Sequence, residues 1–201
     1  MQPIHHKNGS AFFPKLSVGE WIQYQFQCAI RRDYPEIAIT GFGNVPTSQA
    51  VREIWGWEGT HADHAKPIIF VGAAHMIAPD AMMVREGTHY AVEIKQKRID
   101  PRFNNILLDV KEIIELETSA AALNQQPLFV FHTSYIDETH PEEHIGDYSH
   151  IMPLESFYTA TPEYLSGLPV WPAYGNSNAH VRPKLKDLVP AVDWMKNHAT
   201  H

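Results

Sequence analysis

Cysteine is nearly absent from this sequence, since Cys28 is the only one among 201 residues. A single thiol cannot form a disulfide within the chain, and it cannot build a thiolate metal cluster. Long apolar runs are also absent, because no segment approaches the roughly 18 apolar residues that a membrane span needs. The first residues, Met-Gln-Pro-Ile-His-His-Lys, lack the apolar block of a signal peptide. We therefore expect a soluble, cytoplasmic protein that does not cross a membrane.

Positive charge is scarce as well. Lysine and arginine number 16 against 23 aspartates and glutamates, which gives a formal net charge of −7. This balance counts against nucleic-acid binding, because phosphate contacts need lysine and arginine. The basic residues are nevertheless clustered, with one group over residues 95–102 and a second over residues 182–186. The charge balance therefore weakens the case for a nucleic-acid partner without excluding it.

The sequence periodicity predicts a mixed α/β core within a single domain. The predicted elements are, in chain order, a helix at 17–33, a short strand at 36–40, a short helix at 48–55, strands at 67–71, 80–84 and 90–96, a helix at 104–123 capped by Asn104, and a strand at 128–132. Strands 90–96 and 128–132 flank a helix, so they should pair in parallel through a right-handed crossover. Residues 134–201 are interpreted as an extension wrapped on the core, with a strand near Ile151 and a last helix at about 185–197.

The stretch 79–97 carries the strongest functional signal. It predicts two strands joined by a tight turn at Glu86-Gly87, and strand alternation places Glu93 and Lys95 on one face. Asp80 starts the partner strand and can reach the same point. Two carboxylates and a lysine that converge at a sheet edge suit metal-assisted phosphodiester cleavage.

Chance and a purely structural role are the alternatives for this pattern. A second match, Asp109-Val110-Lys111, lies in the predicted helix, where positions two apart do not face each other. On a strand, positions two apart do face the same way, so only Glu93 and Lys95 can build a site. The structural alternative is a surface hairpin with an exposed ion pair, which would contribute about 0.2–1 kcal/mol.

Pro79-Asp80, Glu93-Ile94-Lys95, the preceding strand and the following helix together resemble the PD-(D/E)XK nuclease superfamily over residues 17–133. The resemblance implies a restriction-endonuclease-like core of helix, three-strand meander, helix and parallel strand, in a mixed sheet flanked by helices. Asp80 and Glu93 offer hard oxygen ligands for Mg²⁺ or Mn²⁺. The resemblance implies the Ile94 carbonyl as a further ligand. Lys95 would orient the attacking hydroxide or stabilise the charge that grows on the phosphate.

Four further residues are candidates for the site. In many members of the superfamily a glutamate on the first helix faces the metal, which makes Glu20 a provisional fourth catalytic residue. Ser17-x-x-Glu20 also fits a capping box, in which Glu20 only satisfies the helix start. Lys97 shares the face of Lys95, so it is a candidate phosphate contact. Arg98 and Arg102 follow where the strand passes into the helix, and all three basic residues could equally be solvated.

Thirteen histidines suggest a zinc hydrolase as a different possibility. His61-x-x-His64 and His140-x-x-x-His144 have spacings that metal ligands use. Neither pair matches His-Glu-x-x-His and no third ligand is indicated, so ordinary surface histidines explain them better. Trp171 and Tyr174 could stack on bases, although buried packing is the commoner role of such residues.

The sequence therefore predicts a divalent-metal-dependent nuclease that hydrolyses phosphodiester bonds, most simply in DNA. Its main alternative is a catalytically inactive nucleic-acid- or protein-binding module on the same fold. Cleavage of both strands by one site per chain would favour a homodimer.

Overall fold

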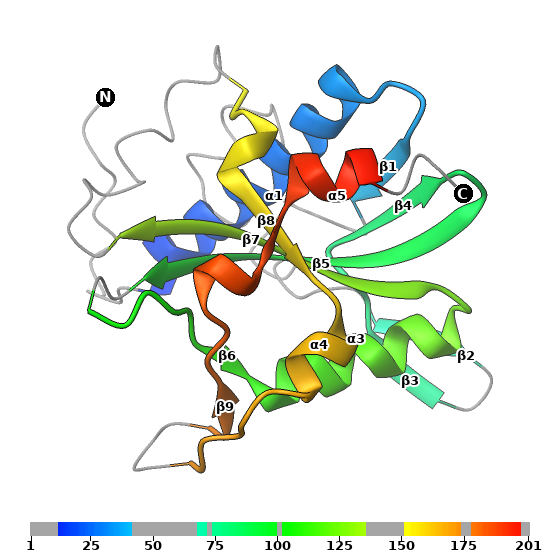
Figure 1. Cartoon of the computed structure of the whole chain (residues 1–201). Coiled ribbons are helices and arrows are strands. Elements are labelled where there is room, and N and C mark those ends of the chain that lie inside the picture. The colour runs from blue at the N-terminus through cyan, green and yellow to red at the C-terminus, as the bar shows by residue number, and fades with distance from the viewer. Residues whose placement is uncertain are drawn as a thin grey trace.

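A mixed six-stranded sheet forms the centre of the protein, with the strand order β1-β4-β5-β7-β8-β10 (Figure 1). The computed structural model describes residues 12–41, 68–71, 74–99, 102–135, 151–173 and 178–197. The helices are α1 (Phe12–Asp33), α3 (Val110–Ala122), α4 (Pro162–Ser166) and α5 (Ala191–Asn197), with 3₁₀ turns at Leu154–Ser156 and Leu185–Asp187. The strands are β1 (Ala38–Gly41), β2 (Ile68–Val71), β3 (Ala74–Ile77), β4 (Ala81–Arg85), β5 (Thr88–Ile99), β6 (Leu108–Asp109), β7 (Gln126–Tyr135), β8 (Phe157–Ala160), β9 (His180–Val181) and β10 (Val189–Pro190).

The predicted mixed α/β fold, a mixed sheet flanked by helices, is confirmed. Strands β1, β4 and β5 form an antiparallel meander between α1 and α3. Strand β5 then pairs in parallel with β7, from Tyr90 opposite Gln126 to Ile99 opposite Tyr135. Beyond β7 the sheet continues antiparallel through β8 and β10. The division into a core at 17–133 and an extension at 134–201 stays a prediction, although these last two strands belong to the same sheet.

Helices cover both faces of the sheet, because its central strands are apolar on both sides. On β5, Val92 and Ile94 pack in one core cluster with side chains of α1 and α5. Ala91 and Ile99 point the other way and pack in a second cluster with α3 and α4. Figure 1 shows α1 and α5 on one side of the sheet and α3 and α4 on the other. Glu93 and Lys95 alternate with Val92 and Ile94, so they project toward α3.

The turn between β4 and β5 lies where it was predicted. Glu86 and Gly87 have φ angles of 48° and 78°, and they join Arg85 and Thr88, which are the last pair of the ladder. Two consecutive left-handed residues form the hairpin turn that best matches the twist of the flanking strands. This turn fixes the register that sets Ala81 opposite Val92.

Two of the predicted strands have a different place in the structure. The first strand of the meander is β1, close to the predicted strand 36–40, and not the strand at 67–71. Residues 68–71 instead pair with β3, which was not predicted, in a separate two-stranded sheet. The apolar run at 68–71 fits a strand in either sheet, so its composition could not identify its partner.

Both long helices begin at different residues from those predicted. Helix α1 begins at Phe12, so Ser17 lies inside it and the capping box with Glu20 is wrong. Helix α3 begins at Val110 after the N-cap Asp109, and Asn104 has a φ of 48° and does not cap it. The backbone before α3 is instead extended and pairs with the C-terminal segment, as Ile106 N donates to Pro183 O. That partner lies far along the chain, which local periodicity cannot reveal.

The C-terminal predictions are only partly confirmed. Ile151 itself lies in no strand, and the nearest one, β8, begins only at Phe157; the last helix, α5, covers only the second half of the predicted range. The predicted short helix at 48–55 lies outside the described residues. None of the described helices is both long enough and apolar enough to cross a membrane.

Candidate active site

Asp80 lies at the point where pairing between β4 and β5 stops. The ladder ends with Ala81 opposite Val92, so the next residues of β5 extend past the start of β4. There the Oδ2 atom of Asp80 accepts a hydrogen bond from the backbone N–H of Ile94 at 2.8 Å. Asp80 is only 1% exposed. Its carboxylate thus takes the place of a backbone partner and is held firmly against β5.

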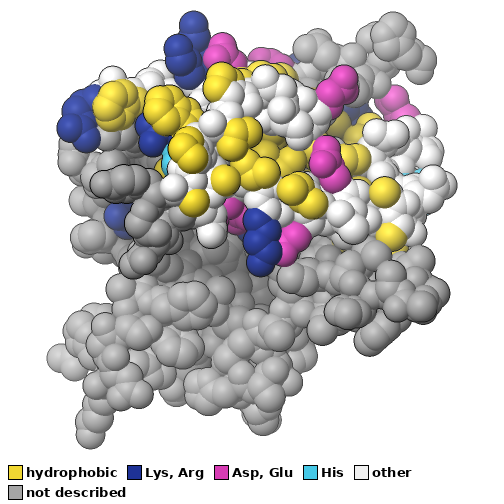
Figure 2. Space-filling view, turned by 90° about the horizontal axis from the view of Figure 1, so that it is seen from below, with side chains coloured by type: hydrophobic (Ala, Val, Ile, Leu, Met, Phe, Trp, Pro, Cys, Tyr) yellow, Lys and Arg dark blue, Asp and Glu magenta, His cyan; other side chains and the backbone are white. Residues whose placement is uncertain are grey.

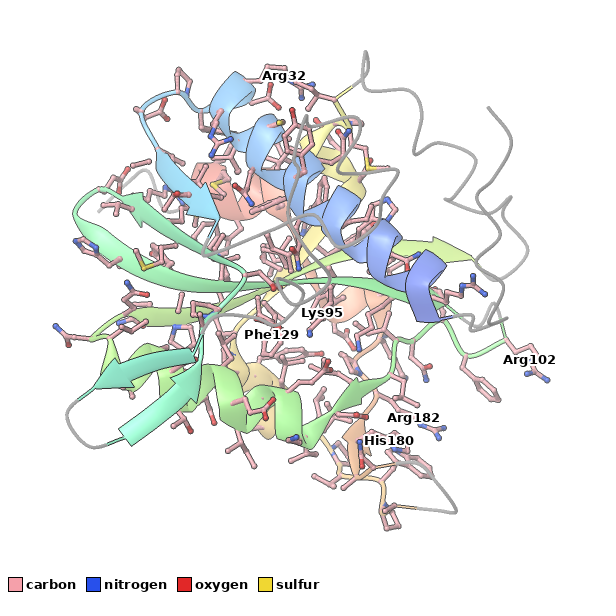
Figure 3. All side chains as sticks on the ribbon, turned by 180° about the vertical axis from the view of Figure 1, so that it is seen from behind. Arg32, Lys95, Arg102, Phe129, His180 and Arg182 are labelled. Carbon is pink, nitrogen blue, oxygen red and sulfur yellow. The ribbon has the colours of Figure 1, made fainter. Side chains whose placement is uncertain are left out.

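Glu93 and Lys95 meet on the α3 face of β5, as the strand alternation predicted. The Nζ atom of Lys95 lies 2.8 Å from Oε1 of Glu93. Lys95 lies near the middle of the molecule, beside the central strands (Figure 3). Both side chains are largely buried, with 24% of Lys95 and 11% of Glu93 exposed. This burial separates the pair from an ordinary exposed ion pair on a surface hairpin.

Glu112, in the first turn of α3, completes a chain of alternating charges. Its Oε1 lies 3.1 Å from Nζ of Lys95, and its Oε2 lies 3.3 Å from Nζ of Lys97. The order of contacts is Glu93, Lys95, Glu112, Lys97. The sequence prediction missed Glu112. The predicted helix start at Asn104 places Glu112 well inside the helix, so the local pattern did not point to this contact; the observed start at Val110 brings Glu112 into the first turn.

The carboxylates around Lys95 keep its side chain charged. Burial on its own would lower the pKa of Lys95, but the carboxylates of Glu93, Glu112 and Asp80 outweigh it and raise that pKa. Burial would likewise raise the pKa of Glu112, and the ammonium groups of Lys95 and Lys97 outweigh it and lower that pKa. Lys95 and Glu112 are therefore ionised near neutral pH.

A pocket opens directly above these charges. It has a volume of about 200 Å³ and lies between the segment before β4, strand β5 and helix α3. Its lining residues are Ala78, Pro79, Glu93, Lys95, Glu112, Glu115, Leu116 and Ser119. A space of this size takes a phosphate group with a few waters, and carboxylates and an ammonium face into it. The arrangement can bind a cation at the carboxylates and an anion at Lys95.

The other residues predicted for the site are Arg98, Arg102 and Glu20. Arg98 is exposed near the end of β5, and Arg102 lies at the edge of the molecule, away from Lys95 (Figure 3). The Arg102 guanidinium stacks 5.4 Å from the ring centre of Phe103. The side chain of Glu20 lies outside the described part of the structure. Helix α1, which carries Glu20, packs on the face of β5 that holds Val92 and Ile94, opposite to Glu93 and Lys95.

The histidine pairs add no metal site within the described structure. His61, His64, His140 and His144 all lie outside the described residues. In the part that is described, no group of three or more His, Cys, Asp or Glu side chains could hold a metal ion by itself. A metal at Asp80 and Glu93 would therefore need backbone oxygen and water as further ligands.

Comparison with known proteins identifies no family for this chain. No protein-family model matches the sequence, and no curated protein matches it. Among solved structures, the fold is similar to Hjc, a Holliday junction resolvase from the archaeal hyperthermophile Archaeoglobus fulgidus. The two share 9% sequence identity with a TM-score of 0.42, over 85% of this chain and 98% of the resolvase. A likeness at this level carries no argument about activity, which must come from the residues of the site.

Proposed function

We propose that this protein is a divalent-metal-dependent nuclease that hydrolyses phosphodiester bonds, most simply in DNA. One observation carries the proposal: a glutamate and a charged lysine line one pocket, and a buried aspartate is hydrogen-bonded to Ile94, the residue between them, at the point where a strand pair ends. A purely structural hairpin does not need three ionisable groups to be buried together, because burying such groups is costly. The cost is understandable if the groups serve a reaction.

Asp80 and Glu93 are the proposed metal ligands, and their chemistry fits Mg²⁺ or Mn²⁺. These hard cations take oxygen ligands and keep several waters, so two carboxylates can suffice with one backbone oxygen. In an extended strand the N–H and C=O of one residue point to the same side. Since Ile94 N donates toward Asp80, the Ile94 carbonyl oxygen faces that side as well. When bound, such a cation would polarise the phosphate and lower the pKa of a bound water.

Lys95 is the proposed electrostatic group of the reaction. Its raised pKa keeps it protonated, so it can donate hydrogen bonds but cannot act as a general base. A buried ammonium is suited to orienting the nucleophile and to stabilising the charge that grows on the phosphate. Glu112 holds Lys95 through a second ion pair, independent of Glu93, so the ammonium stays in place when Glu93 binds a cation.

Lys97, Arg98 and Arg102 are the proposed contacts to the nucleic-acid backbone. Lys97 is tied to Glu112, whereas Arg98 and Arg102 are exposed beyond it. Glu20 remains a proposed fourth catalytic residue whose helix lies on the other face of β5. A cytoplasmic location and a homodimer that cuts both strands complete the proposal.

Cleavage of labelled DNA tests this function. We expect cleavage with Mg²⁺ or Mn²⁺ and none with EDTA. Asp80→Asn keeps an oxygen that can accept from Ile94 N, so it should fold but lose about a thousandfold in rate or more, given several kcal/mol supplied by the metal. Lys95→Ala should lose about a hundredfold. Asp193→Asn and Lys196→Ala, at exposed positions on α5, are the controls and should cleave like the parent.

An inactive binding module on the same fold is the second candidate. It is favoured by the full pairing of the charges, since Lys95 already contacts two carboxylates. The two candidates differ in their response to metal. A nuclease with this site should be stabilised by Mg²⁺ or Mn²⁺ because the ion binds the folded state, whereas the module should not respond.

A further inference from the structure

The segments 104–110 and 179–185 form a short antiparallel ladder at the start of α3. Leu108 lies opposite Val181 and Asp109 opposite His180, and a bridge joins Asn105 to Lys184. Trp171 joins the outer side of this ladder. It exchanges both backbone hydrogen bonds with His180, at 2.8 and 3.0 Å.

The two faces of this ladder differ in character. Ile106, Leu108 and Val181 point inward and are at most 1% exposed in the core beneath. The same register sets Leu107 opposite Arg182 on the outer face. Leu107 is 47% exposed and Trp171 is 50% exposed. This outer face differs from an ordinary solvated surface, because large exposed apolar side chains lie next to basic side chains on it.

Arg182 and Trp171 form an organised pair on the outer face. The guanidinium of Arg182 stacks 4.5 Å from the ring centre of Trp171. Arg182 Nε donates to Nε2 of His180 at 3.2 Å, and Nδ1 of His180 lies 3.1 Å from the Asn178 carbonyl oxygen. Because Nε2 accepts, the proton of the neutral imidazole sits on Nδ1 and is donated to Asn178. This relay fixes the plane of the guanidinium against the ring.

The charge on this surface is mostly positive, in a protein whose net charge is −7. Lys184 and Lys186 are exposed and follow Arg182 in the sequence. The stacked pair Arg102 and Phe103 directly precedes segment 104–110 of the ladder. In Figure 2, hydrophobic and basic side chains lie side by side at the left edge of the described surface. Two acidic residues are near: Asp109, whose Oδ2 accepts from Asn178, and Asp187, which is exposed.

We propose that this aromatic and basic surface binds unpaired nucleotides, so that the substrate of the proposed nuclease includes a single-stranded segment. The inference rests on the proposed function. Trp171 can stack only on a base whose face is open, which a duplex does not present, and Arg182 and Lys184 suit the phosphates. The ladder leads into α3 within three residues of Glu112, which contacts Lys95. A nucleic-acid strand bound on this surface would therefore lie beside the helix that lines the pocket.

The test is a binding measurement in EDTA, with a labelled oligothymidylate of about 15 nucleotides and a duplex of equal length. We expect Trp171→Ala to weaken binding of the single strand by about five- to a hundredfold and to leave duplex binding unchanged. Trp171→Phe keeps a stacking ring and should retain most of the affinity. Val170→Ala, at the adjacent residue that is 56% exposed, is the matched control and should bind like the parent.

The salt dependence of binding distinguishes the role of Arg182 from that of Trp171. Arg182→Ala should lower the slope of log affinity against log salt by about 0.7, because one phosphate contact to a single strand is lost. Trp171→Ala should leave that slope unchanged, since stacking releases no counterions. Lys196→Ala, on α5 at the other side of the sheet, should change neither affinity nor slope (Figure 1).

Three results would overturn the inference: equal single-strand affinity for parent and Trp171→Ala, equal weakening for single strand and duplex, or a Trp171→Phe variant as weak as Trp171→Ala. Thermal unfolding of each variant shows that it is folded. Because binding is measured without metal, its outcome is separate from catalysis. Loss of cleavage in Asp80→Asn with no effect of Trp171→Ala would retain the nuclease and reject this surface.

Discussion

At the scale of single residues, the site depends on an exact match of charges in a partly buried space. Glu112 is central to that match, because one carboxylate contacts two lysines. Removal of its charge leaves Lys95 and Lys97 partly buried with fewer partners, which is costlier than loss of an exposed ion pair.

Replacement of Glu112 by glutamine should therefore destabilise the protein by about 1–2 kcal/mol. Because the pKa of Glu112 is lowered by folding, its stabilising effect is present above its unfolded pKa and is lost as pH falls through the folded pKa. Urea unfolding should show a parent–variant difference at pH 7 that shrinks below about pH 4.5. Glu117→Gln, exposed on the same helix, should stay within about 0.5 kcal/mol of the parent at either pH.

His132 provides a second residue-scale prediction, on the face of the sheet opposite to the site. Burial lowers its pKa to about 4, and its ring packs edge-on against Phe157. The unfolded chain binds the proton more readily than the folded protein does. The free energy of unfolding should therefore fall by up to about 3 kcal/mol between pH 6.5 and pH 4.

The His132→Phe variant keeps an aromatic ring and removes this proton. Its free energy of unfolding, measured in urea across the same pH range, should fall much less than that of the parent. Equal slopes for the two proteins would show that another group is responsible for acid sensitivity.

At the scale of elements, the β4–β5 hairpin is the device that brings Asp80 to Glu93 and Lys95. Its register depends on the two left-handed residues of the turn. Gly87→Ala should cost about 1 kcal/mol, because a Cβ disfavours that conformation even though nothing lies within 4 Å of it. Gly167→Ala is the matched control: Gly167 has a φ of −76°, and an added Cβ would make ordinary contacts. Thermal unfolding should show the cost at Gly87 alone.

The sequence predicted the parts of this hairpin that depend on local pattern. Strand alternation placed Glu93 beside Lys95, and Glu86-Gly87 marked the turn. It could not predict that β1 rather than β2 completes the meander, because both runs are apolar and only tertiary pairing decides between them. The start of α3 was missed for the same reason. Residues 105–109 pair with the C-terminal segment, and Glu112 therefore falls in the first turn of the helix.

At the scale of the whole molecule, the charge distribution separates the proposed cation site from the proposed anion surface. The carboxylates gather at the pocket, whereas cations of the ladder and of the region after β5 lie outside it. Such a division suits a substrate whose phosphates are held at several points while one is cleaved.

Metal binding should increase the free energy of unfolding of the protein. In the parent, Mn²⁺ at about a hundredfold its dissociation constant should add about 2.7 kcal/mol to the free energy of unfolding. Glu93→Gln should abolish most of this gain, and Trp171→Ala should retain it. A gain of equal size in Glu93→Gln would place the ion elsewhere.

The most direct test of the account is the rate of DNA cleavage by the double variant Asp80→Asn/Lys95→Ala, measured beside the parent with Mn²⁺ under single-turnover conditions. Both proteins should unfold cooperatively, and the variant should show no cleavage above background while the parent cleaves. Cleavage by the double variant at the rate of the parent would contradict the account, because the reaction would then occur without the residues that meet at the start of β4.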